Sequence, residues 1–529
     1  MISLPQRETK LMVAVHGWSG ILLGLLLYAV VVTGAAAVFA SEIGIWSAGH
    51  VGSRSAFAQP MAEAVRRAGE ETPAKYREAV DLFEIGDHEL GAYFHHHETD
   101  AEGNLIARGI FYAFGPGGEI RERREGTDED VYGARNDNAL EHFLVDTHVR
   151  LHVPDPWGLL LTGILGLAML VAAISGLLIH RHLFKDIFTL RRGAKPVLFN
   201  RDRHSVAGTW SLPFAFVLAF TGSFFSFYGT VGVPIVAMAA FGGDVEALTE
   251  AVYGTPGKPD PRPETALGLD RAMAHAIQRA GDVPTFAAIE NFGRADAKLT
   301  TYHAPAGGGL APVSLVYDAT DGTFLQDKPL IGPTPSAGGT LAGIMSPLHF
   351  GNFAGMLSKA VWFGLGFAMS YVIYTGLRLW LARREAGSRS LEWLERGVVV
   401  VGFGLPLALL ACAGAFFLSM PAGTALFWVP AGFLMVSALA IGLGAAWRDV
   451  AGLAGALELA LGVVMLALPP LRLITGGPGW TTALEAGQVI IPALDLALLL
   501  AAGWLLWRVF GRLGQRRSAQ EHPVLQAAE

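Results

Sequence analysis

The sequence predicts an all-α polytopic membrane protein with about eight transmembrane helices and two small α+β modules outside the membrane. Two observations predict this fold. The 529 residues are 52% hydrophobic and only 16% charged, far from the composition of soluble domains. The first part of the chain is also an internal duplication, in which each copy holds two apolar helices separated by a long polar loop.

Eight apolar runs are long enough to span a bilayer, because ~30 Å of hydrocarbon requires about 20 helical residues. They cover residues 12–40, 156–180, 205–229, 355–380, 397–419, 425–446, 451–469 and 486–510. The first run ends in VFASE, as a signal peptide can, but it exceeds the roughly 7–15 apolar residues of such a peptide. We therefore expect a retained helix, and an even number of spans places both termini on one side.

Charge predicts the orientation of the spans. The loop at residues 181–203 has seven Lys or Arg against two acids, and the arginines at 378–384 and 508–517 fall on the same side. By the positive-inside rule this side is cytoplasmic. The loops at 41–155 and 230–347 then lie outside, with 22 acids against 11 bases and 12 against 7. We expect no nucleic acid partner for such acidic modules.

The predicted domains follow the spans and loops. They are residues 1–40 with the first span, a first outer module at 41–155, spans two and three at 156–229, a second outer module at 230–347, the fourth span at 348–385, a bundle of four spans at 386–510 and a tail at 511–529. The last four spans contain no histidine, which favours a scaffold or partner-binding role. Cys412 is the only cysteine, which excludes disulfides, iron–sulfur clusters and covalent haem attachment.

Matched landmarks define the duplication. Spans one and three share a histidine, a glycine and a Thr-Gly pair with identical spacing: His16, Gly20 and Thr33-Gly34, then His204, Gly208 and Thr221-Gly222. Spans two and four share Leu-His-x5-Gly followed by Ser175-Gly176 or Thr375-Gly376. In the loops, residues 110–124 and 314–328 each predict a β-hairpin with a glycine turn, and residues 266–281 have helical periodicity.

Histidines beside the apolar spans are the candidate functional residues, because ionisable groups are costly there and usually have a function. They form two layers: His16, His180 and His204 on the predicted cytoplasmic side, and His148, His152 and His349 on the outer side. Haem b held by two neutral imidazoles needs histidines from different helices and small neighbouring residues, and glycines follow several of these histidines. The two layers therefore predict two non-covalent haems.

Packing of the repeats around a pseudo-two-fold axis would pair His16 with His204 and His152 with His349. His180 has no mate, since Trp380 occupies its equivalent position, and it could replace either partner of the inner pair. His148 is a further candidate ligand. His152 and His180 are separated by ~42 Å of helix rise, so two layers favour transmembrane electron transfer over chemistry at one surface.

Other interpretations remain open. Interfacial histidines also hydrogen-bond lipid headgroups or carbonyls, and the chain could be a membrane-anchored binding module or a permease. The spans lack the buried acids of ion-coupled permeases, apart from Glu458 and Asp495.

The histidine tract at 95–97 is of a kind that binds metals, but neighbours on a strand point to opposite faces. His303 lies in a turn-rich stretch and is expected on the surface.

The chain resembles the PepSY-associated transmembrane family of iron-regulated membrane proteins over residues 10–385. The matching blocks are HGWSGILLGLLLYAVVVTG, LHVPDPWG, ISGLLIHRHLFKDIFTLRRG, RHSVAGTWSLPFAFVLAFTG, SPLHFGNFAG and YTGLRLWLARR. The block ISGLLIHRHLFKDIFTLR favours the siderophore-iron reductase branch, because other relatives have Trp where His180 stands.

Resemblance to that branch implies a di-haem oxidoreductase of the bacterial inner membrane whose outer modules have PepSY-like folds. It implies reduction of a ferric siderophore to ferrous iron on the periplasmic side. The ligands it implies are His16, His180, His204, His152 and His349. The sequence contains no flavin or nicotinamide motif, so we expect electrons from a membrane quinol or a cytoplasmic flavoprotein.

Overall fold

The chain divides into two compact units. The membrane unit contains Met1–Gly49, Arg135–Ser226 and Phe363–Glu529, and the sheet unit contains His50–Ala134 and Phe227–Trp362. The computed structural model describes residues 5–52, 55–86, 89–99, 105–180, 188–191, 196–253, 259–305, 309–332, 334–384 and 388–521. Parts of the predicted basic loop at 181–203 and of the predicted tail at 511–529 lie outside these residues.

Eight helical segments of the described chain are long and apolar enough to cross a membrane, which confirms the predicted polytopic fold. The segments of the duplicated part are α1 (Gln6–Ala37), α6 (Trp157–Ile179), Val197–Phe241 and α13 (Gly355–Ala382). The third is longer than the predicted 205–229, because α8 (Pro196–Phe227) is followed by a π-helical turn (Tyr228–Gly232) and by α9 (Val233–Phe241). α1 packs against α6 and against α5 (Ala139–Arg150).

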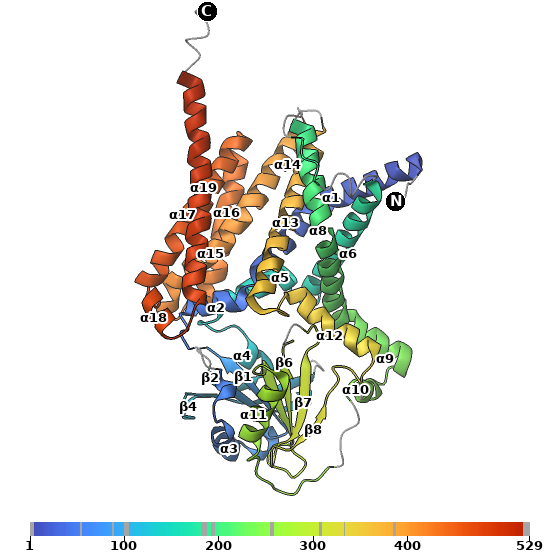
Figure 1. Cartoon of the computed structure of the whole chain (residues 1–529), viewed down its shortest axis with the longest axis vertical. Helices are drawn as coiled ribbons and strands as arrows, with labels where there is room; N and C mark the ends of the chain where they lie inside the picture. The colour runs from blue at the N-terminus through green and yellow to red at the C-terminus, as the bar shows by residue number, and fades with distance from the viewer. Residues whose placement is uncertain are drawn as a thin grey trace, which may run out of the picture. The chain divides into compact units, whose positions relative to one another are not determined.

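The C-terminal bundle contains the other four spans (Figure 1). Its helices are α14 (Arg389–Val399), α15 (Leu405–Ser419), α16 (Ala425–Ala446), α17 (Val450–Ile474), α18 (Trp480–Glu485) and α19 (Ile490–Glu521). A π-helical turn at Val400–Gly404 joins α14 to α15. There, the Tyr28 hydroxyl of α1 donates a 2.7 Å hydrogen bond to the Gly402 carbonyl, which links the bundle to the duplicated part.

An ion pair is buried inside the bundle. Arg472 and Asp495, both fully buried, form an ion pair of 2.7 Å between α17 and α19. The same carboxylate accepts hydrogen bonds from the indole N–H groups of Trp46, in α2 (Ala40–Ala48), and Trp480. Because a charge in an apolar interior is tolerated only with partners, this cluster holds α2, α17, α18 and α19 together.

The sheet unit is built on one antiparallel sheet of eight strands in the order β4-β3-β2-β1-β5-β6-β7-β8. The first module supplies β1 (Ala79–Ile85), β2 (Glu89–Thr99), β3 (Leu105–Phe114) and β4 (Ile120–Thr127). The second supplies β5 (Phe286–Glu290), β6 (Lys298–His303), β7 (Val313–Asp318) and β8 (Phe324–Asp327). Both predicted hairpins are present, as β3–β4 and β7–β8.

The two modules share that sheet, because β1 pairs with β5 from Ala79↔Glu290 to Leu82↔Ala287. One face is covered by α3 (Ala62–Glu71) and α11 (Leu269–Ala280), the second of which the periodicity predicts (Figure 1). Val65, Val80, Leu82 and Leu299 are fully buried in the resulting core. The unit also contains α4 (Asp128–Tyr132), α10 (Val245–Tyr253) and α12 (Ala337–Phe350).

The histidines on β2 and β6 of the sheet unit pack against other side chains of that unit. On β2, the rings of His95 and His97 lie on one face with centroids 5.3 Å apart, and His96 lies against Tyr76 on the other face. The expectation that His303 is exposed is wrong, because only 2% of it is accessible. Its burial is tolerated because Nδ1 lies 3.0 Å from the Asp282 carbonyl oxygen and Nε2 lies 3.0 Å from the Thr301 hydroxyl.

Candidate functional site

A cavity of about 590 Å³ lies among α1, α6, α8 and α13 of the membrane unit. Its size is within the range of about 300–1,000 Å³ that is usual for small-molecule and cofactor sites. Glycines form much of its wall: Gly17, Gly20, Gly24, Gly176, Gly208 and Gly376. A Cβ added at Gly20 would meet no atom within 4 Å, so this glycine leaves room at the wall that a side chain would fill.

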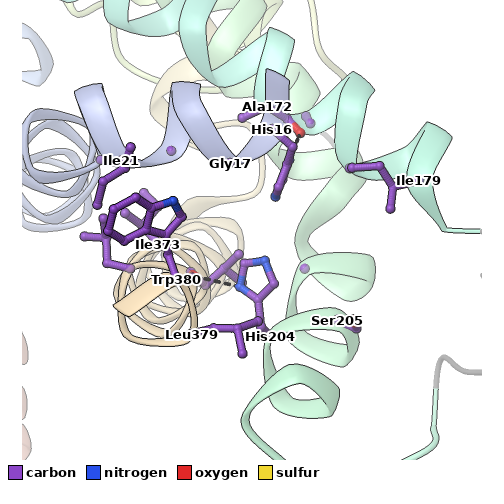
Figure 2. A pocket seen from close by; sticks show the side chains of 18 of the residues that line it. His16, Gly17, Ile21, Ala172, Ile179, His204, Ser205, Ile373, Leu379 and Trp380 are labelled. Carbon is purple, nitrogen blue, oxygen red and sulfur yellow. Dashed lines mark hydrogen bonds between the residues drawn. The ribbon is translucent and has the colours of Figure 1, made fainter. Parts of the chain in front are cut away.

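His16 and His204 project into this cavity from α1 and α8 and face one another (Figure 2). Their ring centroids are 6.2 Å apart. Two imidazoles that bind one metal ion from opposite sides, at ~2 Å each, have ring centres about 6 Å apart. The structure therefore brings the predicted inner pair to the separation that a shared axial metal requires.

Each ring is oriented by a carbonyl of the neighbouring helix. His16 Nδ1 lies 2.9 Å from the Ala172 carbonyl oxygen on α6, and His204 Nδ1 lies 3.0 Å from the Val372 carbonyl oxygen on α13 (Figure 2). A carbonyl only accepts, so Nδ1–H donates and the neutral ring keeps its lone pair on Nε2. This tautomer is the one that a histidine needs to bind a metal through Nε2.

The Ser-Gly and Thr-Gly pairs of the duplication contact these rings. The hydroxyls of Ser175 and Thr375 lie 3.3 Å and 3.5 Å from Nδ1 of His16 and His204, respectively. A Cβ added at the following glycine, Gly176 or Gly376, would lie 3.3 Å or 3.0 Å from Cε1 of that ring. The sequence shows that both pairs occur at equivalent positions of the two repeats. Spacing alone does not predict that they contact the histidine rings.

His148 makes a third copy of this arrangement, on α5. Its Nδ1 lies 3.0 Å from the Val30 carbonyl oxygen of α1 and 3.5 Å from the Thr33 hydroxyl, and a Cβ added at Gly34 would lie 2.7 Å from its Cε1. Burial lowers the pKa of His148, which keeps the ring neutral near pH 7. Among the outer-layer histidines, His148 thus has the same helix-carbonyl orientation as His16 and His204.

His152 has a different environment. Its Nε2 lies 2.6 Å from the Thr147 hydroxyl oxygen, and its Nδ1 lies 3.0 Å from the Asp146 carboxylate. Both ring nitrogens therefore have partners next to α5, and its ring stacks on Phe143. His349 lies near the end of α12 in the sheet unit. The predicted pairing of His152 with His349 stays a prediction.

His180 lines the same cavity as His16 and His204, at the C-terminal end of α6. Its Nδ1 is buried and has no hydrogen-bond partner among the residues that the structure describes. The equivalent residue of the second repeat, Trp380, also lines the cavity, and a Cβ added at Gly17 of α1 would lie 4.0 Å from its ring. The structure thus gathers all three predicted inner-layer histidines around one cavity, and two of them face one another.

Three arginines that the sequence analysis did not connect with the site complete the cavity lining: Arg201, Arg383 and Arg384. No Asp or Glu belongs to the described lining. The pattern of basic residues at the span ends was visible in the sequence, but it was interpreted only as a signal of orientation. The cavity is therefore apolar along its walls and positively charged where these arginines lie.

Comparison with known proteins identifies the fold family. The family described as the PepSY-associated TM region matches residues 13–383, which is most of the chain. The chain is also similar to an uncharacterized protein of Pseudomonas aeruginosa, PA4219, with 27% identity over 413 residues that cover 72% of this chain and 98% of that protein. The family match at residues 13–383 covers the cavity-forming parts of α1, α6, α8 and α13.

Proposed function

Because the chain belongs to the PepSY-associated transmembrane family, we propose that it is a haem b oxidoreductase of the bacterial inner membrane. In this proposal it reduces the iron of a ferric siderophore to ferrous iron on the periplasmic side. The observation that carries it is the facing pair His16 and His204, whose Nδ1 atoms are both held by carbonyls of neighbouring helices.

The residues of the cavity fit a haem. His16 and His204, with ring centroids 6.2 Å apart, would hold the haem iron, and the volume of about 590 Å³ and the glycine-lined wall suit a flat macrocycle. The apolar walls suit its hydrocarbon faces. A bound haem supplies reversible one-electron transfer, and the chain contributes its ligands, its burial and the hydrogen bonds that set the ligands' basicity.

A second haem is proposed for the outer layer. His148 supports this because it repeats the carbonyl, Thr and Gly contacts of the inner ligands. His152 and His349 are the other candidates for this layer. Two haems at the two ends of the spans would let the protein connect a donor on one side of the membrane with an acceptor on the other.

The proposed partners follow from the proposed orientation. With the basic span ends in the cytoplasm, both termini are cytoplasmic and the sheet unit is periplasmic, where it would meet the ferric siderophore. Electrons would come from a membrane quinol or a cytoplasmic flavoprotein. The C-terminal bundle has no proposed chemistry.

The test is a visible spectrum of the purified protein, oxidised and dithionite-reduced, with haem quantified as the pyridine haemochrome. Single alanine substitutions are made at His16, His204, His148, His152 and His349. We expect close to two haems b per chain, and loss of about one of them in His16→Ala and His204→Ala. Protein made with ample haem that shows no Soret band would refute the proposal and favour a binding module without redox activity.

A further inference from the structure

We propose that His180 and Arg383 hold the carboxylates of the haem bound between His16 and His204, so that His180 is a positioning residue and not an axial ligand. This inference rests on the proposed function. It assigns a role to the histidine that has no mate in the duplication, and it identifies the polar edge of the ligand with the basic part of the cavity.

In the proposed site, His16 and His204 would hold the iron. His16 and His204 occupy equivalent positions of the two repeats, face one another, and are each oriented by a carbonyl through Nδ1. His180 has no carbonyl partner on Nδ1, and Trp380 stands at its equivalent position. An iron with two axial imidazoles has no position for a third histidine, so His180 must meet another part of the ligand.

The unpaired Nδ1 of His180 requires a partner. A buried polar atom without a hydrogen bond destabilises the fold, and buried polar groups in native proteins nearly always find a partner. The atom is buried, and the residue lines the cavity. A ligand oxygen in the cavity would satisfy it. Because the ring nitrogen can donate, a carboxylate oxygen is a suitable acceptor.

Charge in the cavity points to the same ligand group. Arg201, Arg383 and Arg384 line it, and no acid belongs to its described lining. Arg384 is stacked on Trp380, with its guanidinium carbon 3.1 Å from the ring centroid, and Arg201 lies 3.6 Å from Asp202. Among the described residues, Arg383 forms no ion pair with an acid. Haem b has two carboxylates on one edge, and guanidinium groups bind carboxylates strongly.

The experiment is a binding cycle with the full-length protein in detergent, produced in cells starved of haem precursors and titrated with haem b or with its dimethyl ester. Esterification removes the carboxylate charges and leaves the iron and the ring unchanged. The variants are Arg383→Gln and His180→Ala. The matched control is Arg378→Gln, near the end of α13 and five residues before Arg383, because Arg378 pairs with Glu395 and does not line the cavity.

We expect Arg383→Gln and His180→Ala each to weaken binding of haem b by about 10-fold or more, since each removes a hydrogen bond to a charged carboxylate. The same variants should bind the dimethyl ester as the unsubstituted protein does. Both should keep the low-spin spectrum of two axial imidazoles. Arg378→Gln should bind both forms of haem normally.

Two results would overturn the inference. One is equal weakening for haem b and its ester in both variants, and the other is a high-spin spectrum in His180→Ala, which would make His180 an axial ligand. If the unsubstituted protein binds no haem, the proposed function fails together with the inference. If it binds haem with the low-spin spectrum, but the two substitutions change the affinity for haem b and for the dimethyl ester by the same factor, only the inference fails.

Discussion

The contact between Gly376 and His204 allows a quantitative test of the proposed inner site. A Cβ added at Gly376 would lie 3.0 Å from His204 Cε1 and 3.4 Å from its Nδ1. Carbon atoms prefer separations of about 3.5–4.0 Å, so Gly376→Ala requires the ring to move by roughly 0.5–1 Å. Such a shift would also disturb the 3.0 Å hydrogen bond to the Val372 carbonyl.

The expected cost follows from overpacking, which destabilises by about 1–3 kcal/mol. Since ~1.4 kcal/mol is tenfold in a binding constant, Gly376→Ala should weaken haem binding at the inner site by roughly 5- to 150-fold. Gly176→Ala, with a contact of 3.3 Å to His16, should have a smaller effect in the same direction. Haem titration of the full-length protein, followed at the Soret band, gives both values.

Gly364→Ala is the matched control. Gly364 lies on the same helix, α13, a Cβ there would meet nothing within 4 Å, and the residue does not line the cavity. Both substitutions gain the same helix propensity, ~1 kcal/mol, so their difference isolates the steric contact with His204. If Gly376→Ala and Gly364→Ala bind haem with the same affinity and the same spectrum, the assignment of His204 as a positioned ligand is refuted.

Three further predictions concern other parts of the chain. His148→Ala should lose about one of two haems in the pyridine haemochrome assay, whereas His152→Ala should keep both; the reverse result would place His152 in the outer ligand set. Asp495→Ala should lower the free energy of unfolding by ~3–5 kcal/mol, measured by thermal unfolding, because its fully buried arginine partner keeps an unpaired charge. Glu458→Ala should lower it less, because its arginine partners are 41% and 50% exposed and can reach water. Equal losses in the two variants would contradict this. Burial lowers the pKa of His303, so the folded sheet unit favours the neutral ring. Its stability should be complete above the unfolded pKa of about 6.5 and fall as the pH drops through that value. The measurement is the protection factor of the β6 amides, which is the exchange rate corrected for the intrinsic rate at each pH; it should be lower at pH 5.5 than at 7.5, and His303→Asn should show a smaller pH effect.

The spans were predictable because membrane crossing imposes a simple requirement of length and apolarity. The facing arrangement of His16 and His204 was predictable for a different reason: a duplicated sequence implies symmetry, and symmetry brings equivalent residues to a common axis. No comparable rule existed for His152, because its partners Thr147 and Asp146 are close in sequence and compete with any distant ligand role.

Long-range pairing and burial were not predictable. The alternating strands of each loop indicated two small modules, but the sequence does not specify that β1 and β5 would join them edge to edge, since a strand of this pattern can pair on either side. His303 was expected on the surface because turn residues surround it. Its burial depends on the Asp282 carbonyl, a backbone group about 20 residues away that no side-chain pattern reveals.

The single eight-stranded sheet has a consequence for biogenesis. Once the first module is made, β1 presents an open edge until β5 appears about 200 residues later, with the spans α6 and α8 between them. At ~5–20 residues per second, this edge stays unpaired for roughly 10–40 s, and such edges are templates for aggregation. Completion of the sheet therefore requires that α6 and α8 are inserted into the membrane first. A chain whose synthesis or insertion stops between α6 and α8 would expose half a sheet to proteases and chaperones.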